Sequence, residues 1–315
     1  MKLRERWLRQ LGGLKAFSVK NKEWLSLLEE DTRQSLMIEG EFVDRRELRE
    51  IIQNGKDGDE RIAQKVMGYF DAASWSYEYA SAQHRENEFQ LTKSLIRQIH
   101  ALMFRNDRHF QYTPGEWRRG DITIHGAPHR PPSAGQVEVA IEDLVRIANT
   151  SKLEPTRLAA LVHALFEHIH PFPDGNGRVG RVLMNFILIA HGLPNIAIKG
   201  LTTERRKYVT ALERADAVLA PALAGRAAWS VALKKPLLGL EDLIAHNLAI
   251  AMDAVICSMF EAQGGELYSL EEVAKRTGRQ LGSLRSAGSQ KKFIATKRGK
   301  QLVTNQVLLK APASR

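Results

Sequence analysis

Residues 170–181 read HPFPDGNGRVGR, a short stretch that holds a histidine, an acid, two arginines and three glycines. An apolar segment with helical spacing, residues 158–169, precedes this stretch, and Pro171 and Pro173 prevent that helix from continuing. A second apolar segment with helical spacing starts at about Arg178. The sequence therefore predicts two helices joined by a tight loop, with His170 at the entrance to the loop.

The predicted loop has the composition of a phosphate-binding site. Gly175 and Gly177 allow the backbone to approach a ligand closely, and the free amides at the start of the second helix attract an anion. Arg178 and Arg181 lie three residues apart on one helical face, so both guanidinium groups can reach the same polyphosphate.

Two further loop residues suit nucleotide chemistry. His170 is a candidate general base. The Asp174 carboxylate would repel a bare phosphate, so we expect it to hold a magnesium ion that bridges phosphate oxygens. His163 and His168 are close in sequence, but they are five residues apart and do not share a helical face, which argues against a zinc site with His170.

Helical periodicity dominates the rest of the chain. It predicts helices over residues 61–80, 88–104, 137–148, 157–168, 179–191, 203–219 and 240–260. The main exception before the C-terminal tail is the segment GDITIHG at residues 120–126, whose alternation between flanking glycines predicts a short hairpin or flap. We therefore expect a mainly α fold, a helical bundle core with a short β-hairpin flap.

Charge divides the chain unevenly. The net charge is +10, and residues 264–315 carry +8 of it, with eleven Lys or Arg against three Glu. This step predicts three segments: a helical N-terminal segment over residues 1–60, a catalytic core over 61–263 and a small basic domain over 264–315.

Composition also bears on the compartment. The single cysteine, Cys257, cannot form an intrachain disulfide and lies in an apolar stretch, so we expect a buried small side chain in a cytoplasmic protein. The N-terminus lacks the apolar core of a signal peptide. The most apolar run, residues 182–190, is too short to span a bilayer, so we expect no membrane association.

The stretch 170–181 resembles the signature of the Fic family, H-x-F-x-[D/E]-G-N-G-R-x-x-R, and matches it at every specified position. The resemblance implies a protein adenylyltransferase that uses ATP and Mg²⁺. In that case His170 deprotonates a Ser, Thr or Tyr hydroxyl of a target protein, and Asp174 holds the metal. The phosphates lie against Gly175, Asn176, Gly177 and Arg178, with Arg181 at the γ-phosphate.

The resemblance extends to two other segments. Ile122, Thr123, Ile124 and His125 resemble the family's flap, which pairs with an extended segment of the target. The segment from Tyr208 to Asp216 resembles the helix on the nucleotide side, with Tyr208 implied as a neighbour of adenosine. Asp216 stands where many relatives have asparagine, which weakens the case for a role there.

Ser35 and Glu39, in SLMIEG at residues 35–40, resemble the inhibitory motif [S/T]-x-x-x-E-[G/N] of a Fic subgroup in which inhibition is encoded in the same chain. The two residues are one helical turn apart, and Gly40 suits a helix C-terminus. A carboxylate at that end of a helix needs a cation, so we expect Glu39 to pair with Arg181 and withhold it from the γ-phosphate. Relatives that use a similarly placed glutamate to remove AMP leave a hydrolase as an alternative.

The basic tail resembles a winged helix-turn-helix. Ser269 is placed to cap a helix, Thr277 and Gly278 to form the turn, and residues 293–304 to form a basic wing. DNA binding through residues 265–315, with Arg279 and Arg285, is one expectation, and a scaffold for protein contacts or a homo-oligomer is the other.

Three functions stay open from the sequence. They are AMP transfer, AMP removal through Glu39, and a DNA-binding regulator whose Fic-like domain senses nucleotide. His170 and Asp174 favour an enzyme because a sensor needs no base. Fic relatives that transfer a phosphoryl group depart from the GNGR core, which argues for AMP.

Overall fold

The computed structural model describes residues 1–55, 60–124, 130–223, 235–237 and 239–312. The chain forms two compact units. One comprises residues 16–244, and the other comprises residues 1–15 together with 245–315. The three segments expected from the charge distribution stay a prediction.

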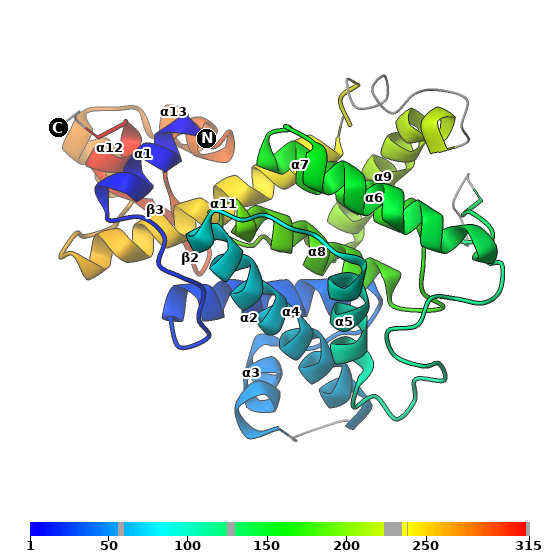
Figure 1. The fold of residues 1–315 in the computed structure, drawn as a ribbon. Coiled ribbons are helices and arrows are strands. Elements are labelled where there is room, and N and C mark those ends of the chain that lie inside the picture. The colour runs from blue at the N-terminus through cyan, green and yellow to red at the C-terminus, as the bar shows by residue number, and fades with distance from the viewer. Residues whose placement is uncertain (56–59, 125–129, 224–234, 238, 313–315) are drawn as a thin grey trace. The chain divides into compact units, whose positions relative to one another are not determined.

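The secondary structure of the larger unit, in its described part, consists of helices joined by loops (Figure 1). Its helices are α2 (Lys22–Ile38), α3 (Arg45–Asn54), α4 (Glu60–Glu86), α5 (Lys93–Phe104), η1 (Ala134–Gln136), α6 (Val137–Thr150), α7 (Pro155–Ile169), α8 (Asn176–Ala190) and α9 (Thr202–Leu223), followed by the start of α11 (Leu240–Ala262). Each predicted helix is present, and the mainly α fold class is confirmed. The sequence analysis missed α1 (Lys2–Gln10) and α3.

The centre of this unit is α8, which packs against α7, α4, α5 and α2. All but one of its fifteen residues are buried, which explains why its sequence is apolar on every face. Gly180 permits the close approach of α7, since an added Cβ would lie 2.4 Å from Glu167 Oε1. The loop at the start of α8 is therefore attached to a buried and closely packed helix.

The end of α2 is built from two kinds of contact. Leu36 joins an apolar cluster with residues of α3 and α4, among them Leu48, Ile51 and Val66. Beyond it, Gly40 has φ +87°, and the amides of Gly40 and Glu41 donate to Met37 O and Leu36 O. This left-handed termination at Gly40 leaves Glu39 as the C-cap residue of α2, directly before Gly40.

The predicted flap differs from expectation in its described part. No strand forms over residues 121–124, and His125 lies outside the described residues. Instead, Asp121 Oδ1 accepts a hydrogen bond of 2.7 Å from the Ala134 amide. The two sides of this segment are thus joined by a side chain, and no ladder of backbone pairs is seen among the described residues.

The smaller unit combines α1 and most of α11 with β1 (Tyr268–Ser269), α12 (Leu270–Thr277), α13 (Leu281–Ser289), β2 (Thr296–Arg298), β3 (Gln301–Thr304) and η2 (Gln306–Leu309). The strands are antiparallel in the order β1-β3-β2, with Thr296 opposite Val303. Ser269 caps α12 and Gly278 ends it with φ +67°, as predicted. Cys257 is buried, and burial raises the pKa of its thiol to about 12.

The expectation of no membrane association stays a prediction. Within the described ranges, α11 is long and apolar enough to cross a bilayer, with 23 residues and a mean hydropathy of 1.7 over its most apolar window. Half of that window is buried inside the protein, and a core helix has the same length and composition. Periodicity predicted this helix, but its apolar character was not recognised because Asp253 and other polar residues interrupt the apolar ones.

Candidate active site

The loop between α7 and α8 places His170 at a strained backbone position. His170 ends α7 with φ 48° and ψ 60°, a left-handed conformation that costs a non-glycine residue roughly 1–2 kcal/mol. Its ring Nδ1 lies 3.2 Å from Glu167 O. A carbonyl oxygen can only accept, so Nδ1 carries the proton and Nε2 keeps the lone pair that a base needs.

Asn176 holds the loop closed. Its side chain accepts from the Phe172 amide at 2.9 Å and donates to Phe172 O at 2.8 Å. The residue is 1% exposed. The oxygen and the nitrogen of the Asn176 side chain are thus both hydrogen-bonded already. The expected contact of Asn176 with phosphate is therefore assigned to its backbone amide.

Gly175 caps α8, which begins at Asn176, and the Gly175 amide is already bonded to the Asp174 carboxylate. Gly175 has φ +82° and is packed beneath by the ring of Phe104, which leaves no room for a side chain. The free amides of the first turn and the positive end of the helix dipole make this turn attractive to phosphate.

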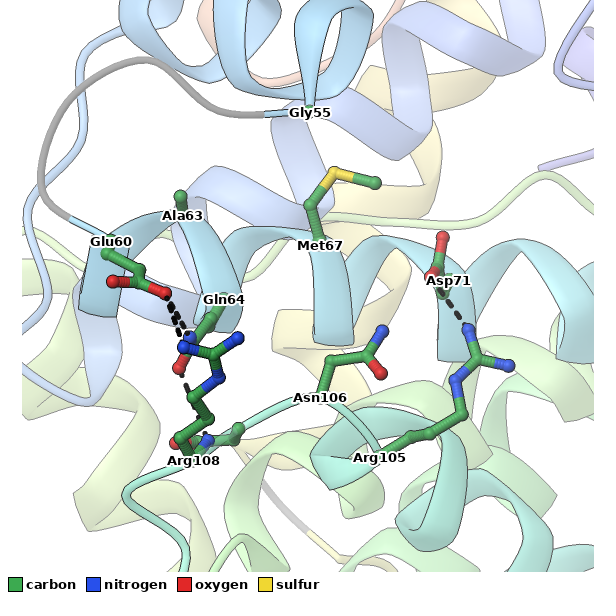
Figure 2. A pocket seen from close by; sticks show the side chains of 10 residues that line it. Gly55, Glu60, Ala63, Gln64, Met67, Asp71, Arg105, Asn106 and Arg108 are labelled. Atoms are coloured by element: carbon green, nitrogen blue, oxygen red, sulfur yellow. Dashed lines mark hydrogen bonds and ion pairs between the residues drawn. The ribbon is translucent and has the colours of Figure 1, made fainter.

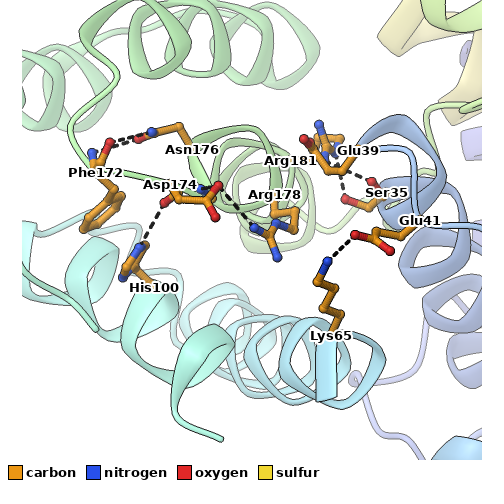
Figure 3. Close-up of polar contacts among 11 residues, drawn as sticks. Ser35, Glu39, Glu41, Lys65, His100, Phe172, Asp174, Asn176, Arg178 and Arg181 are labelled. Carbon is orange, nitrogen blue, oxygen red and sulfur yellow. Dashed lines mark hydrogen bonds and ion pairs between the residues drawn. The ribbon is translucent and has the colours of Figure 1, made fainter. Parts of the chain in front are cut away.

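The two arginines of the motif differ in their surroundings. Arg178 lies over the Phe104 ring at 4.7 Å and 3.4 Å from Asp174 Oδ1. Arg181 is 2% exposed and donates to Ser35 Oγ at 2.7 Å, to Ser35 O at 3.2 Å and to Glu39 Oε1 at 2.6 Å (Figure 3). The expected pairing of Glu39 with Arg181 is thus present.

Glu39 also lies over the start of α8. A Cβ added to Gly177 would be 2.7 Å from Glu39 Oε1, so the carboxylate is next to the turn that is predicted to receive phosphate. Burial alone would raise the pKa of Glu39, but the positive charges of Arg181, Arg178 and Arg205 outweigh it and lower that pKa. Glu39 is therefore charged at neutral pH.

Asp174 is placed where a metal ligand would be accessible. Its side chain is 59% exposed, and Oδ1 accepts from the Gly175 amide. Among the described residues there is no cluster of three metal-ligating side chains, so a cation here would need substrate oxygens to complete its shell. The zinc alternative at His163, His168 and His170 has no such cluster either.

Tyr208 and Asp216 contact histidines of α7. Tyr208 is 3% exposed, and its hydroxyl lies 2.7 Å from His163 Nε2. Asp216 Oδ1 accepts from His168 Nδ1 at 3.1 Å. Both side chains of α9 thus support the helix that bears His170, while contact of Tyr208 with adenosine stays a prediction.

Sequence analysis missed four polar residues of this region. His100 accepts the Gly115 amide at 2.8 Å, so its Nε2 donates to Asp174 O at 3.2 Å, and its ring stacks on Phe172. Burial lowers the pKa of His100 to about 4. Arg118, Asp31 and Glu167 are the others, and no local pattern distinguishes any of the four from neighbouring polar residues.

Glu167 and Asp31 are buried acids. Burial raises the pKa of Glu167 to about 8, and its Oε1 has no hydrogen-bond partner. Burial raises the pKa of Asp31 to about 7, although the Tyr77 hydroxyl, which donates to it at 2.6 Å, favours the ionised form. Asn185 of α8 also donates to Asp31, at 3.2 Å, and so ties α2 to the central helix.

A separate pocket of about 540 Å³ lies between the first turns of α4 and the segment after α5 (Figure 2). Its charged groups pair with one another, Glu60 with Arg108 and Asp71 with Arg105. No residue of the 170–181 stretch lines it. We assign no role to this pocket.

Comparison with known proteins agrees with this geometry. Residues 90–188 match the model of the Fic/DOC family, so this part of the chain is a domain of that family. It is 34% identical over 191 residues to a probable protein adenylyltransferase of Aquifex aeolicus, which covers 60% of this chain and 55% of that protein. It is 40% identical over 105 residues to the protein adenylyltransferase Fic of Drosophila willistoni, covering 32% of this chain and 20% of that protein.

Solved structures share the fold. A Fic-domain-containing signalling protein from Bacteroides thetaiotaomicron superposes with a TM-score of 0.64 at 22% identity, covering 84% of this chain and 97% of that one. Fic-1 of C. elegans superposes with a TM-score of 0.60 at 19% identity, covering 84% and 71%. The chain spans about half the length of the Aquifex relative and a fifth of the Drosophila relative.

Proposed function

We propose that this protein is a protein adenylyltransferase that moves AMP from ATP to a hydroxyl group of a target protein. The observation that carries the proposal is the juxtaposition of the His170 imidazole with the free amides and arginines at the start of α8. The names of the Aquifex and Drosophila relatives support the same activity.

The chemistry follows from the residues of the loop. His170 Nε2 takes the proton of the target hydroxyl while its oxygen attacks the α-phosphorus of ATP in line. The new oxygen–phosphorus bond forms as the bond to the bridging oxygen of the β-phosphate breaks, and pyrophosphate leaves. The α8 amides and Arg178 stabilise the charge on the phosphates.

A magnesium ion fits the same site. The Asp174 carboxylate is an oxygen ligand of the kind that Mg²⁺ prefers, and phosphate oxygens would supply the further ligands. When bound, the ion would neutralise phosphate charge. His100 orients this part of the loop through its bond to Asp174 O.

We infer that Glu39 restrains the enzyme. It holds Arg181 and lies beside Gly177, so it occupies both the guanidinium and the space that the γ-phosphate requires. ATP that enters while Glu39 is in place would bind with its phosphates out of line for transfer.

Replacing the ionised carboxylate tests both ideas. In Glu39→Gln and Glu39→Gly we expect AMP incorporation from α-labelled ATP to rise about tenfold or more, because each frees the Arg181 fork that otherwise binds a carboxylate. Adding His170→Ala should abolish that labelling.

The control is Glu50→Gln, which breaks an exposed ion pair with Arg46 on the surface of α3. It should leave labelling unchanged. Equal labelling in Glu39→Gly and wild type would contradict restraint by Glu39. Labelling that survives His170→Ala would contradict the proposed reaction.

The smaller unit favours DNA as a second partner. Five basic residues of this unit are exposed: Lys275 on α12, Arg279 between α12 and α13, Lys292 after α13, and Lys297 and Lys300 on the β2–β3 hairpin. Arg285, which the sequence analysis also assigned to DNA, is paired with Glu271 at 2.8 Å. A compact unit with a basic helix and a basic hairpin suits contact with phosphates in a groove.

Salt dependence tests this partner. We expect affinity for duplex DNA to fall steeply with salt, and Lys297→Ala with Lys300→Ala to weaken binding and to lower the slope by about one per lost phosphate contact. The matched control, Arg46→Ala on α3, should change neither quantity. No binding at low salt would contradict the proposal.

A further inference from the structure

Arg118 is a buried cation whose side chain donates hydrogen bonds to four backbone oxygens. It lies just before the predicted flap and is 5% exposed. Its Nε donates to His170 O at 2.9 Å, its Nη1 to Gly120 O at 3.0 Å, and its Nη2 to Pro132 O and to Ile169 O at 3.4 Å. The guanidinium of Arg118 therefore donates hydrogen bonds to four carbonyl groups.

These four carbonyls belong to two different parts of the site. Ile169 O and His170 O are at the C-terminal end of α7, where a helix leaves its last carbonyls without partners and where a positive charge is favourable. Gly120 O and Pro132 O lie on either side of the segment that resembles the target-binding flap. One guanidinium thus joins the turn that carries the base to both sides of that segment.

Two backbone contacts reinforce this junction. The Arg118 amide donates to Pro171 O at 2.8 Å, one residue after His170. Asp121 Oδ1 binds the Ala134 amide and holds the two sides of the segment together. The guanidinium therefore lies inside a frame of backbone, and a side chain without its planar fork would leave several carbonyls without donors.

This arrangement can stabilise the strained backbone of His170. The left-handed backbone of His170 persists only if its surroundings hold it. Arg118 binds the carbonyl of that same residue, and so contributes directly to the orientation of the imidazole.

We propose that Arg118 is a positioning residue. It sets the distance between the His170 base and the predicted flap, the segment that would pair with the target protein. The proposal rests on the proposed AMP transfer and deepens it. Arg118 contacts neither ATP nor target. Arg118 acts on the alignment of the target hydroxyl with the His170 base. Loss of Arg118 should therefore lower kcat and raise the KM for the target protein, while the affinity for ATP is retained.

The test compares Arg118→Lys with Arg119→Ala, both in the Glu39→Gly background. Lysine keeps the charge but has no fork that reaches both sides. Arg119 is the adjacent arginine, 87% exposed and paired with Glu116, so Arg119→Ala removes a neighbouring charge and leaves the contacts of Arg118 in place. We expect Arg118→Lys to lower kcat/KM for transfer by about 100-fold, the cost of a displacement near 1 Å, with the Kd for ATP unchanged.

A second readout does not depend on activity. The His170 ring-proton resonance, assigned by its absence in His170→Ala, should shift or broaden in Arg118→Lys and stay unchanged in Arg119→Ala. Arg118→Gln, which keeps a planar group with two donors, serves if the lysine variant does not fold.

The outcomes separate the two proposals. If the Glu39→Gly parent transfers no AMP, the proposed function fails, and the His170 resonance alone decides the role of Arg118. A folded Arg118→Lys with kcat/KM within threefold of its parent and an unshifted resonance would overturn the inference. A fall in ATP affinity equal to the fall in kcat/KM would also overturn it, because Arg118 would then act on the nucleotide site.

Discussion

The two helix ends that meet at Arg181 are built differently. The start of α8 is held by contacts within a few residues, such as Asn176 with Phe172, and stands on a helix that is almost wholly buried. The end of α2 reaches the site with Glu39, whose side chain is 38% exposed and depends on an ion pair with a residue 142 positions away.

This difference separates a permanent structure from a reversible one. The catalytic loop keeps its shape through local bonds and core packing, so a ligand at the site does not have to build it. We expect that the Glu39 carboxylate can leave Arg181 without disturbing the core, because Leu36 anchors the apolar side of α2. A phosphate would then replace the Glu39 carboxylate as the anion bound to Arg181.

The largest effect is expected where the permanent side is broken. Asn176→Ala removes both bonds to Phe172 and leaves a buried amide and carbonyl without partners, which should cost roughly 2–5 kcal/mol of unfolding free energy. Chemical denaturation measures this. AMP transfer should fall in the same variant even at temperatures where it is folded, because the loop loses its closure.

Its control is Asn106→Ala, an asparagine in the pocket of Figure 2, which lies outside the loop. We expect less than about 1 kcal/mol of change there. A stable and fully active Asn176→Ala would mean that the loop does not depend on this side chain.

A smaller effect is expected at Asp31, the buried acid of α2 that binds Asn185 of α8. The pKa of Asp31 is raised to about 7, so the folded state binds a proton that the unfolded state releases above about pH 4. The contribution of Asp31 to stability is therefore present at low pH and is lost as pH rises toward 7. Between pH 5 and pH 7 the wild type should lose about 2 kcal/mol relative to Asp31→Asn.

Denaturant unfolding at several pH values in both proteins measures the difference. Asp143→Asn, at an exposed ion pair with Arg146, should parallel the wild type. Parallel pH curves for Asp31→Asn and wild type would show that Asp31 is ionised in the fold throughout this range.

The smallest effect is expected at a contact just beyond Glu39. Lys65 of α4 forms an ion pair with Glu41 and so holds the residue after the helix end against the core (Figure 3). Lys65→Met keeps much of the volume and removes the charge. We expect labelling from ATP to rise about two- to threefold, less than in Glu39→Gln, because the contact to Arg181 survives.

Lys93→Met supplies the comparison, since Lys93 pairs with Glu138 and Glu142 on a surface away from α2. Its labelling should match that of wild type. If Lys65→Met raised labelling as far as Glu39→Gln does, the ion pair with Glu41 would be the main restraint.

Much of the fold was predictable because its signals are local. Helical periodicity identified α4 to α9 and α11, and the prolines and glycines around His170 located the loop between α7 and α8. The ends of α12 in the C-terminal tail were predictable for the same reason, since Ser269 and Gly278 favour the start and the end of a helix. The segment at residues 121–124 was less predictable, because alternation alone does not supply a partner strand.

The sequence by itself determined the helices, the loop and the chemical character of residues 170–181, since periodicity, proline, glycine and side-chain chemistry act over a few residues. Only the tertiary structure decided that Glu39 lies over Gly177, that Asp31 of α2 binds Asn185 of α8, and that Arg118 rather than Arg119 binds His170 O. Contacts of this kind join residues between 52 and 154 positions apart or choose between identical neighbours. They are set by how helices pack and which side chains become buried, and no local pattern records that.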